Sequence, residues 1–267
     1  MDRKTAAVHT WDPERYLTYA DERGRPFVEL MARIGATAPE TVVDLGCGPG
    51  NLTALLAARW PDADVRGVDS SPEMIAVARR EHHARLSFAV GDLRDWTAPD
   101  GGVDVIVSNA TLQWVPDHLD LLPRLLTHVR RGGWLAFQVP GNFDEPSHTI
   151  GSELAAEPEF AAYSREVTVP ASHDSATYLE ALAALGCAVD AWETTYLHVL
   201  TDADDPDPVF TWVSGTGARP TLEALPARLR DAFEEKFKAR LRVAYPSRPY
   251  GVVLPFRRVF VVAQVPA

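Results

Sequence analysis

The chain has 267 residues and a formal net charge of −11, enough length for one large α/β domain with an inserted cap. This charge argues against nucleic acid or an anionic membrane as a partner, and no apolar run reaches membrane-spanning length. The N-terminus, Met1-Asp2-Arg3-Lys4, lacks an apolar signal segment, and two cysteines are too few for a disulfide framework, so we expect a cytoplasmic protein. An anionic substrate would need a locally positive pocket in so acidic a protein.

The order of the predicted elements indicates a doubly wound α/β fold. We expect an N-terminal helical lid segment over 1–37, a Rossmann-like core over 38–200, a helical cap insertion over 201–255 and a final strand of the core within 256–267. The expected strands are 41–45, 64–68, 86–90, 103–107, 134–139, 188–198 and 258–265, and the expected helices begin near Asn51 or cover 73–80, 178–185, 208–214 and 224–244. Residues 141–175 are predicted to be mixed and loop-rich.

A glycine-rich turn follows the first expected strand, and its spacing is D-x-G-x-G-x-G from Asp44 to Gly50. The glycines allow positive φ and a close approach of the backbone to a ligand. A dinucleotide site has the spacing G-x-G-x-x-G, and an acid before the first glycine would repel a diphosphate. The turn therefore predicts a nucleotide-type cofactor that carries a positive charge.

Polar residues end the next strands at the same edge of the sheet. Asp69 follows the second strand, 25 residues after Asp44, and can accept hydrogen bonds from both hydroxyls of a ribose. Asp92 is placed to bind an adenine amino group, and Met74 is either an adenine contact or core filler. The candidate cofactor-binding residues on these segments are Asp44, Gly46, Cys47, Gly48, Asn51, Asp69, Ser70, Met74, Asp92, Leu93, Asn109 and Ala110.

These motifs resemble the class I S-adenosyl-L-methionine dependent methyltransferases, and nearly the whole chain is similar to the trans-aconitate 2-methyltransferase family. The Leu112-Gln113-Trp114 and Arg219-Pro220 segments are the most specific, whereas Ala218 departs from the leucine expected there. The other segments that carry the resemblance are Trp11-Asp12-Pro13, Tyr16-Leu17, Glu22-Arg23, Arg25-Pro26, Asp69-Ser70-Ser71-Pro72, Met74-Ile75-Ala76, Asn109-Ala110, Pro116-Asp117-His118, Gln138-Val139-Pro140, Glu145-Pro146, His148, Thr194-Thr195-Tyr196, His198, Trp212-Val213, Thr216-Gly217 and Arg257 to Ala263.

The resemblance implies a mostly parallel seven-stranded sheet with an antiparallel last strand. It implies methyl esterification of trans-aconitate, with S-adenosyl-L-methionine as cofactor and S-adenosyl-L-homocysteine as product. A carboxylate is ionised at neutral pH because free carboxyls titrate near pH ~4. We therefore expect no general base and no catalytic side chain beyond those that position the reactants.

A tricarboxylate favours planar, bidentate arginine partners. The candidate substrate-binding residues are Arg23, Arg219 and Arg257, with Arg25 less favoured, and Tyr196, His198 and Tyr250 as hydrogen-bond donors. Each arginine has a structural ion pair as its alternative role. The candidates near the sulfonium are Trp11, Tyr16 and Tyr19, as an aromatic lid, and Trp114, as a cleft residue; all four have core packing as the alternative.

Three other functions stay open. One is a methyltransferase for another small acid or a hydrophobic metabolite, and a lid without clustered arginines would favour it. A nicotinamide-dependent oxidoreductase is opposed by Asp44 and the glycine spacing. The third is a regulatory module that binds S-adenosyl-L-methionine without turnover. No zinc-type spacing of histidines and carboxylates occurs, so we expect no metal.

Overall fold

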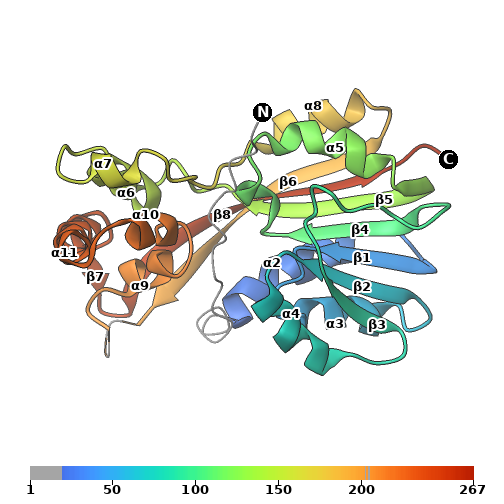
Figure 1. Ribbon diagram of the computed structural model, residues 1–267, viewed down its shortest axis with the longest axis horizontal. Helices are drawn as coiled ribbons and strands as arrows, with labels where there is room; N and C mark the ends of the chain where they lie inside the picture. Colours follow the sequence, from blue (N-terminus) through green and yellow to red (C-terminus); the bar gives the residue numbers. More distant parts are fainter. Residues whose placement is uncertain (1–19, 202, 204) are drawn as a thin grey trace.

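The computed structural model describes residues 20–201, 203 and 205–267, with side chains from residue 24 onward. Figure 1 shows two lobes, an α/β core and a helical cap, joined by two long strands that cross from one lobe to the other. Among the described residues, no helix combines the length and apolar character needed to cross a membrane.

The core lobe is built on one mixed sheet. Its order is β3-β2-β1-β4-β5-β8-β6, with the short β7 paired to β8. Strands β1 to β5 are parallel, and β8 runs antiparallel between β5 and β6. The strands are β1 (Thr41–Leu45), β2 (Asp64–Asp69), β3 (Leu86–Val90), β4 (Val103–Asn109), β5 (Val129–Pro140), β6 (Ala188–Leu200), β7 (Ser247–Arg248) and β8 (Gly251–Gln264). The predicted doubly wound fold and the antiparallel placement of the last strand beside β5 are confirmed.

Helices cover both faces of this sheet. One buried cluster joins α2, α3 and α4 to one face, and a second joins α5 and α8 to the other. Both faces are therefore covered, as expected for strands with continuous apolar runs. These helices are α2 (Ala20–Arg33), α3 (Asn51–Arg59), α4 (Pro72–Ala78), α5 (His118–Leu126) and α8 (Ser175–Ala183), and two 3₁₀ turns are η1 (Arg79–Glu81) and η2 (Leu112–Trp114).

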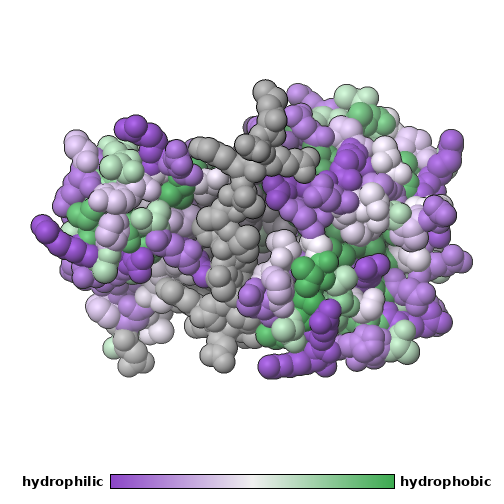
Figure 2. Space-filling model, viewed as in Figure 1, coloured by the Kyte–Doolittle hydropathy of each residue, from purple (hydrophilic) through white to green (hydrophobic). Residues whose placement is uncertain are grey.

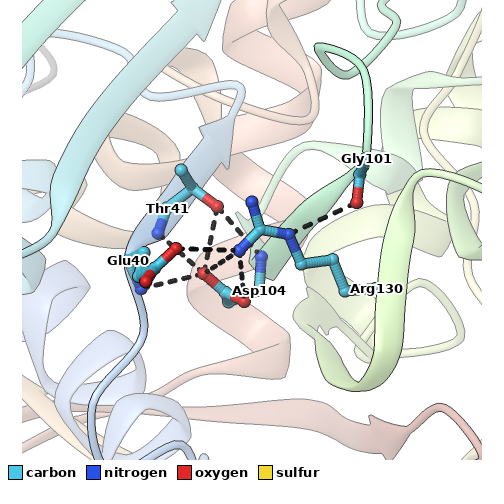
Figure 3. A network of polar contacts seen from close by, with 5 residues as sticks. All are labelled: Glu40, Thr41, Gly101, Asp104 and Arg130. Carbon is cyan, nitrogen blue, oxygen red and sulfur yellow. Dashed lines mark hydrogen bonds and ion pairs between the residues drawn. The ribbon is translucent and has the colours of Figure 1, made fainter.

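A polar network holds the amino-terminal ends of the central strands together (Figure 3). The Asp104 carboxylate accepts hydrogen bonds from the backbone N–H groups of Glu40 and Thr41, both at 2.8 Å, and pairs with Arg130 at 3.0 Å. Burial alone would raise the pKa of Asp104, but these donors and the charge of Arg130 outweigh it and lower the pKa. The network fixes β1, β4 and β5 at the sheet edge opposite the glycine turn.

The cap lobe has a hydrophobic core of its own. Its helices are α6 (Pro146–Ala155), α7 (Ala161–Ser164), α9 (Pro208–Ser214), α10 (Arg219–Ala224) and α11 (Ala227–Ala244). Phe160, Phe233 and Phe237 are fully buried among them, and Leu254 and Phe256 of β8 belong to the same cluster. The distal part of β8 is thus the foundation on which the cap helices pack.

Three sequence predictions need correction. Residues 141–175, predicted to be mixed and loop-rich, contain α6 and α7, so the cap is built from two separate segments; Pro146 is at the first turn of α6. Strand β8 begins at Gly251 rather than 258, so the predicted boundary at 255/256 falls inside a strand. The extension contains Pro255, a residue that argues against a central strand. It is tolerated here because this part of β8 has β6 as its only long neighbour. Strand β5 begins at Val129 and includes Gly132 and Gly133.

The surface seen in Figure 2 is largely hydrophilic over both lobes, with smaller hydrophobic patches among the polar residues. This agrees with the net charge of −11 and with the burial of the large aliphatic side chains in the three clusters.

Replacing Phe237 by alanine tests whether the cap core stabilises the protein. The ring is fully buried and lies 5.9 Å from the rings of both Phe210 and Phe233. We expect F237A to lower the free energy of unfolding by about 3–5 kcal/mol, because the lost apolar contacts leave a cavity. Urea unfolding followed by circular dichroism measures this change.

The matched control is V243A, on the same helix with 83% of Val243 exposed, which should change the unfolding free energy by less than about 0.5 kcal/mol. Equal stabilities of the two variants would contradict a packed cap core.

Candidate functional site

The glycine turn between β1 and α3 is tied to the end of β2. The backbone N–H groups of Gly46 and Cys47 donate to the Val68 carbonyl oxygen at 2.7 and 3.1 Å. At Gly46, φ is +82°, and an added Cβ would lie 2.1 Å from Thr111 Oγ1. Only glycine fits there, because the backbone approaches the segment after β4 too closely for a side chain.

Gly48 has the opposite surroundings. Its φ is +55°, yet an added Cβ would meet no heavy atom of the described residues within 4 Å. Its N–H donates to Asp69 Oδ2 at 2.9 Å. The turn is therefore open at this glycine, and a ligand can approach its backbone.

Asp69 presents a carboxylate at the end of β2, beside the turn. Its second oxygen accepts the N–H of Ser71 at 2.8 Å, at the start of α4. Burial raises the pKa of Asp69, although the two backbone N–H groups oppose the rise. The carboxylate is thereby held in a fixed orientation as a hydrogen-bond acceptor.

Asp44 is the second carboxylate of this edge and is only 2% exposed. Thr53 Oγ1 donates to its Oδ2 at 2.6 Å, while Oδ1 has no hydrogen-bond partner among the described residues. Burial raises the pKa of Asp44 to about 7; the Thr53 hydrogen bond opposes the rise and the charge of Asp69 adds to it. A cation brought to this edge would favour the ionised form of both acids.

The remaining predicted cofactor residues lie around this edge with different exposures. Cys47, Met74, Leu93 and Asn109 are buried, and burial raises the pKa of the Cys47 thiol, which leaves it protonated. Asp92 is engaged by Arg94, with contacts of 3.0 Å from Nε to each carboxylate oxygen. Ser70 is exposed, Asn51 is the first residue of α3, and Ala110 follows β4. Trp11, Tyr16 and Tyr19 lie outside the described residues.

A cleft lies where β4 and β5 end and the cap begins, and its empty space, including the solvent at its open mouth, is about 650 Å³. The core contributes Asn109, Gln113, Trp114 and Gln138, and β8 contributes Phe256 and Arg258. From the cap side come Phe143, His148, Trp212 and Thr216. Among the described residues that line the cleft, Arg258 is the only charged one, and none is an aspartate or glutamate.

The carboxamides in the cleft are unusually placed for buried groups. Asn109 and Gln138 are register partners on β4 and β5, 9% and 1% exposed, and neither side-chain oxygen has a hydrogen-bond partner in the described structure. The Gln113 amide donates to the Ala110 carbonyl oxygen at 2.6 Å, where Ala110 has φ of +52°. An unpaired buried carbonyl costs about 1–3 kcal/mol, and αL geometry at a non-glycine residue about 1–2 kcal/mol. Such costs concentrate at sites that bind a ligand.

His148 is a neutral histidine in this cleft. Its Nδ1 lies 3.0 Å from Ser147 Oγ and 3.5 Å from Asn142 Nδ2. Burial lowers the pKa of His148 to about 4, so the ring is uncharged at neutral pH. It can donate or accept a hydrogen bond there but adds no positive charge.

The predicted substrate residues are not all brought to the cleft. Arg257 pairs with Glu193 at 3.0 Å, Arg219 pairs with Glu223 at 2.6 Å, and Tyr250 is 65% exposed near the β7–β8 turn. Tyr196 donates to Glu29, and Arg25 lies 4.7 Å from the centroid of the Tyr196 ring. His198 stacks on the cleft residue Trp212 at 4.9 Å, but it is not itself among the residues that line the cleft. The side chain of Arg23 lies outside the described residues.

Sequence reasoning missed Arg258 and His148 as cleft residues. A signal for Arg258 existed, because it alternates with Phe256 and Phe260 on one face of a strand. Because the expected strand began only at 258, Phe256 lay outside it and the alternation was incomplete. No spacing pattern singles out His148, since the cap segments that enclose it are far apart in the chain. Within the described part of the chain, no three residues of the His, Cys, Asp or Glu type form a metal-binding group.

A comparison with family models matches residues 42–133 to a methyltransferase domain. The trans-aconitate 2-methyltransferase of Rhodococcus jostii (strain RHA1) is 52% identical over 96% of this chain and 99% of its own length. The enzyme of that name from Streptomyces avermitilis is 51% identical over 97% of this chain and 98% of its own.

Solved structures share the fold at low sequence identity. The YcgJ protein from Bacillus subtilis has a TM-score of 0.58 and 13% identity, covering 91% of this chain and 99% of that one. Geranyl diphosphate C-methyltransferase from Streptomyces coelicolor A3(2), solved with Mg²⁺, geranyl diphosphate and S-adenosyl-L-homocysteine, has a TM-score of 0.52 and 19% identity, covering 90% and 76%.

Replacing Asp44 by asparagine tests the raised pKa. A carboxyl with a pKa near 7 when folded and 3.8 ordinarily holds its proton more tightly in the folded state, so stability falls as pH rises between these values. D44N lacks this titration and keeps an acceptor for Thr53. We expect the Tm of ligand-free D44N to exceed that of wild type by about 2–4 °C or more at about pH 8, and the gain to shrink towards about pH 5. A pH-independent Tm difference in thermal scans would contradict the raised pKa.

Proposed function

The chain belongs to the trans-aconitate 2-methyltransferase family, and on this premise we propose that it methylates a carboxylate of trans-aconitate with S-adenosyl-L-methionine as methyl donor. One observation carries the proposal beyond the family relationship. An acidic glycine turn stands beside a cleft whose lining, among the residues with described side chains, has one positive and no negative side chain. The two parts suit a cationic cofactor and an anionic acceptor.

The residues at the glycine turn fit the cofactor. Gly48 leaves its backbone open, Asp44 has an oxygen without a partner among the described residues, and Asp69 is an oriented acceptor. When bound, the cofactor supplies an electrophilic methyl group on a sulfonium. We propose that Asp69 holds the ribose hydroxyls and that Asp44 offsets the positive charge. The remaining proposed cofactor contacts are Gly46, Cys47, Gly48, Asn51, Ser70, Met74, Asp92, Leu93, Asn109, Ala110 and Trp114, with Trp11, Tyr16 and Tyr19.

The reaction needs alignment rather than a general base. A carboxylate acceptor is already ionised at neutral pH, and no proton has to be removed from it. Holding the reactants in line contributes about 7–11 kcal/mol to such reactions. Trp114, Phe143, Trp212 and Phe256 provide apolar walls that exclude water from the cleft. The neutral His148 fits this scheme as a hydrogen-bonding group.

The alternatives differ in what they require of the cleft. A hydrophobic acceptor would make no use of the positive charge that Arg258 contributes to the cleft lining. A different small acid fits the same residues and is separated from trans-aconitate only by assay. A dinucleotide-dependent oxidoreductase would place phosphates beside Asp44 and Asp69, and a regulatory module would bind the cofactor without turnover.

The direct test is transfer of radiolabelled methyl groups from S-adenosyl-L-methionine to trans-aconitate, cis-aconitate, citrate and isopropylmalate. We expect a base-labile methyl ester formed preferentially on trans-aconitate, because its carboxylates are ionised and the cleft is cationic. Labelling of another acid in preference would reassign the substrate. No label on any acid, with cofactor binding intact, would contradict the proposal and favour the regulatory module.

Replacing Asp69 by asparagine tests the cofactor site. We expect the Kd for S-adenosyl-L-homocysteine to rise by about 10- to 100-fold, because a charged acceptor of two hydroxyl hydrogen bonds is lost. The control is D64N at the other end of β2, where an exposed Asp64 pairs with Arg85 at 3.1 Å. Calorimetric titration should show D64N within about twofold of wild type. Equal affinity of D69N and wild type would remove Asp69 from the site.

A further inference from the structure

Two consecutive arginines of β8 lie on opposite faces of the sheet. Arg257 pairs with Glu193, whose carboxylate also accepts the N–H of Ser175 at the start of α8. Arg258 lines the cleft and is 5% exposed, whereas 35% of the Arg257 side chain is exposed. The alternation of the strand thus gives one arginine to the α8 face and the other to the cleft.

Arg258 is held at a fixed place in the sheet. It pairs with Pro140, the residue at the carboxyl end of β5. Arg258 therefore stands at the carboxyl edge of the sheet, where the parallel strands end. Its guanidinium carbon lies 4.3 Å from the centroid of the Phe256 ring, a cation–π contact on the same strand face. A guanidinium ordered in this way loses little entropy when it binds a planar anion.

The strand order separates Arg258 from the glycine turn. Strands β4 and β5 lie between β1 and β8, and neighbouring strands are about 4.8 Å apart, so the two features are about 14 Å apart across the sheet. The cleft lies between them, at the ends of β4 and β5. A methyl donor seated on the glycine turn therefore approaches the cleft from the end opposite to Arg258.

The chemistry of methyl transfer also favours binding of Arg258 to a carboxylate other than the one that reacts. The attacking oxygen needs a free lone pair and full negative charge, and a bidentate guanidinium would occupy both oxygens and draw off that charge. The useful position for the arginine is on a second carboxylate, which it anchors while the first stays reactive.

We propose that Arg258 binds a carboxylate of the substrate that is not methylated, and that this contact makes the enzyme require an acid with at least two carboxylates. The inference rests on the proposed function for the identity of the reacting group, but the binding contact itself does not require turnover. Arg257, the residue indicated by the sequence, has a structural role at the α8 face instead.

The test is calorimetric binding of tricarballylate, a saturated tricarboxylate, to wild type, R258Q, R258K and R257Q, each saturated with S-adenosyl-L-homocysteine. We expect R258Q to weaken binding by about 10- to 100-fold, the effect of losing hydrogen bonds to a charged group. R258K keeps the charge but not the planar fork and should lose about 5- to 10-fold. R257Q should bind within about twofold of wild type.

Steady-state kinetics with trans-aconitate and but-2-enoate, a monocarboxylate, give the second readout. The KM of R258Q for trans-aconitate should rise by a similar factor with a smaller change in kcat, and its preference over but-2-enoate should collapse. Should R258Q fail to fold, R258K decides, because wild-type affinity in R258K would overturn the proposal. Equal losses in R257Q and R258Q, or no tricarballylate binding by wild type, would also overturn it. Arg258-dependent binding without any ester product would leave this inference standing and reject the proposed methyl transfer.

Discussion

The architecture depends on a mismatch in strand length at one edge of the sheet. Strands β6 and β8 stay paired from Ala188 and Gln264 to Leu200 and Val252, whereas β5 leaves β8 at Pro140. Beyond that point the two strands continue as a ribbon past the carboxyl edge, as Figure 1 shows. A lone ribbon is marginal in water, and here the cap helices bury part of its apolar side chains, namely Leu200, Val252, Leu254 and Phe256. The cap in turn is supported by the ladder of the core, so the cleft between them has two rigid walls.

The glycine turn and the cleft carry charges of opposite sign. Asp44 and Asp69 stand at the ends of β1 and β2, and Arg258 stands on β8, three strand positions from β1 and four from β2. With a net charge of −11 the whole surface would repel an anion, so attraction has to be local. A buried arginine in a cleft where no described lining residue is an acid provides it, because its field is screened less there than on the surface. The same protein can then hold a cationic donor and an anionic acceptor side by side.

How far the sequence could predict these sites follows from how each is encoded. The glycine turn is local, because a strand, three glycines and a helix start within ten residues determine its geometry. Asp69 can be predicted as well, because it follows β2 and an open parallel sheet binds its ligand at the carboxyl ends of its strands. The cleft is not local: His148, Trp212 and Arg258 come from α6, α9 and β8. Their meeting depends on how the cap folds back over the sheet, and no spacing in the chain encodes that distance.

Arg257 and Arg258 show most clearly what cannot be predicted from the sequence. From the residues alone, both fit an anion-binding role, and the family resemblance directs attention to the segment rather than to one side chain. The doubly wound fold, the acidic glycine turn and the family can all be predicted from the order of the residues. Which arginine faces the cleft becomes clear only in the folded chain, because successive residues of a strand point to opposite faces and the register of β8 against β5 and β6 sets which face is which.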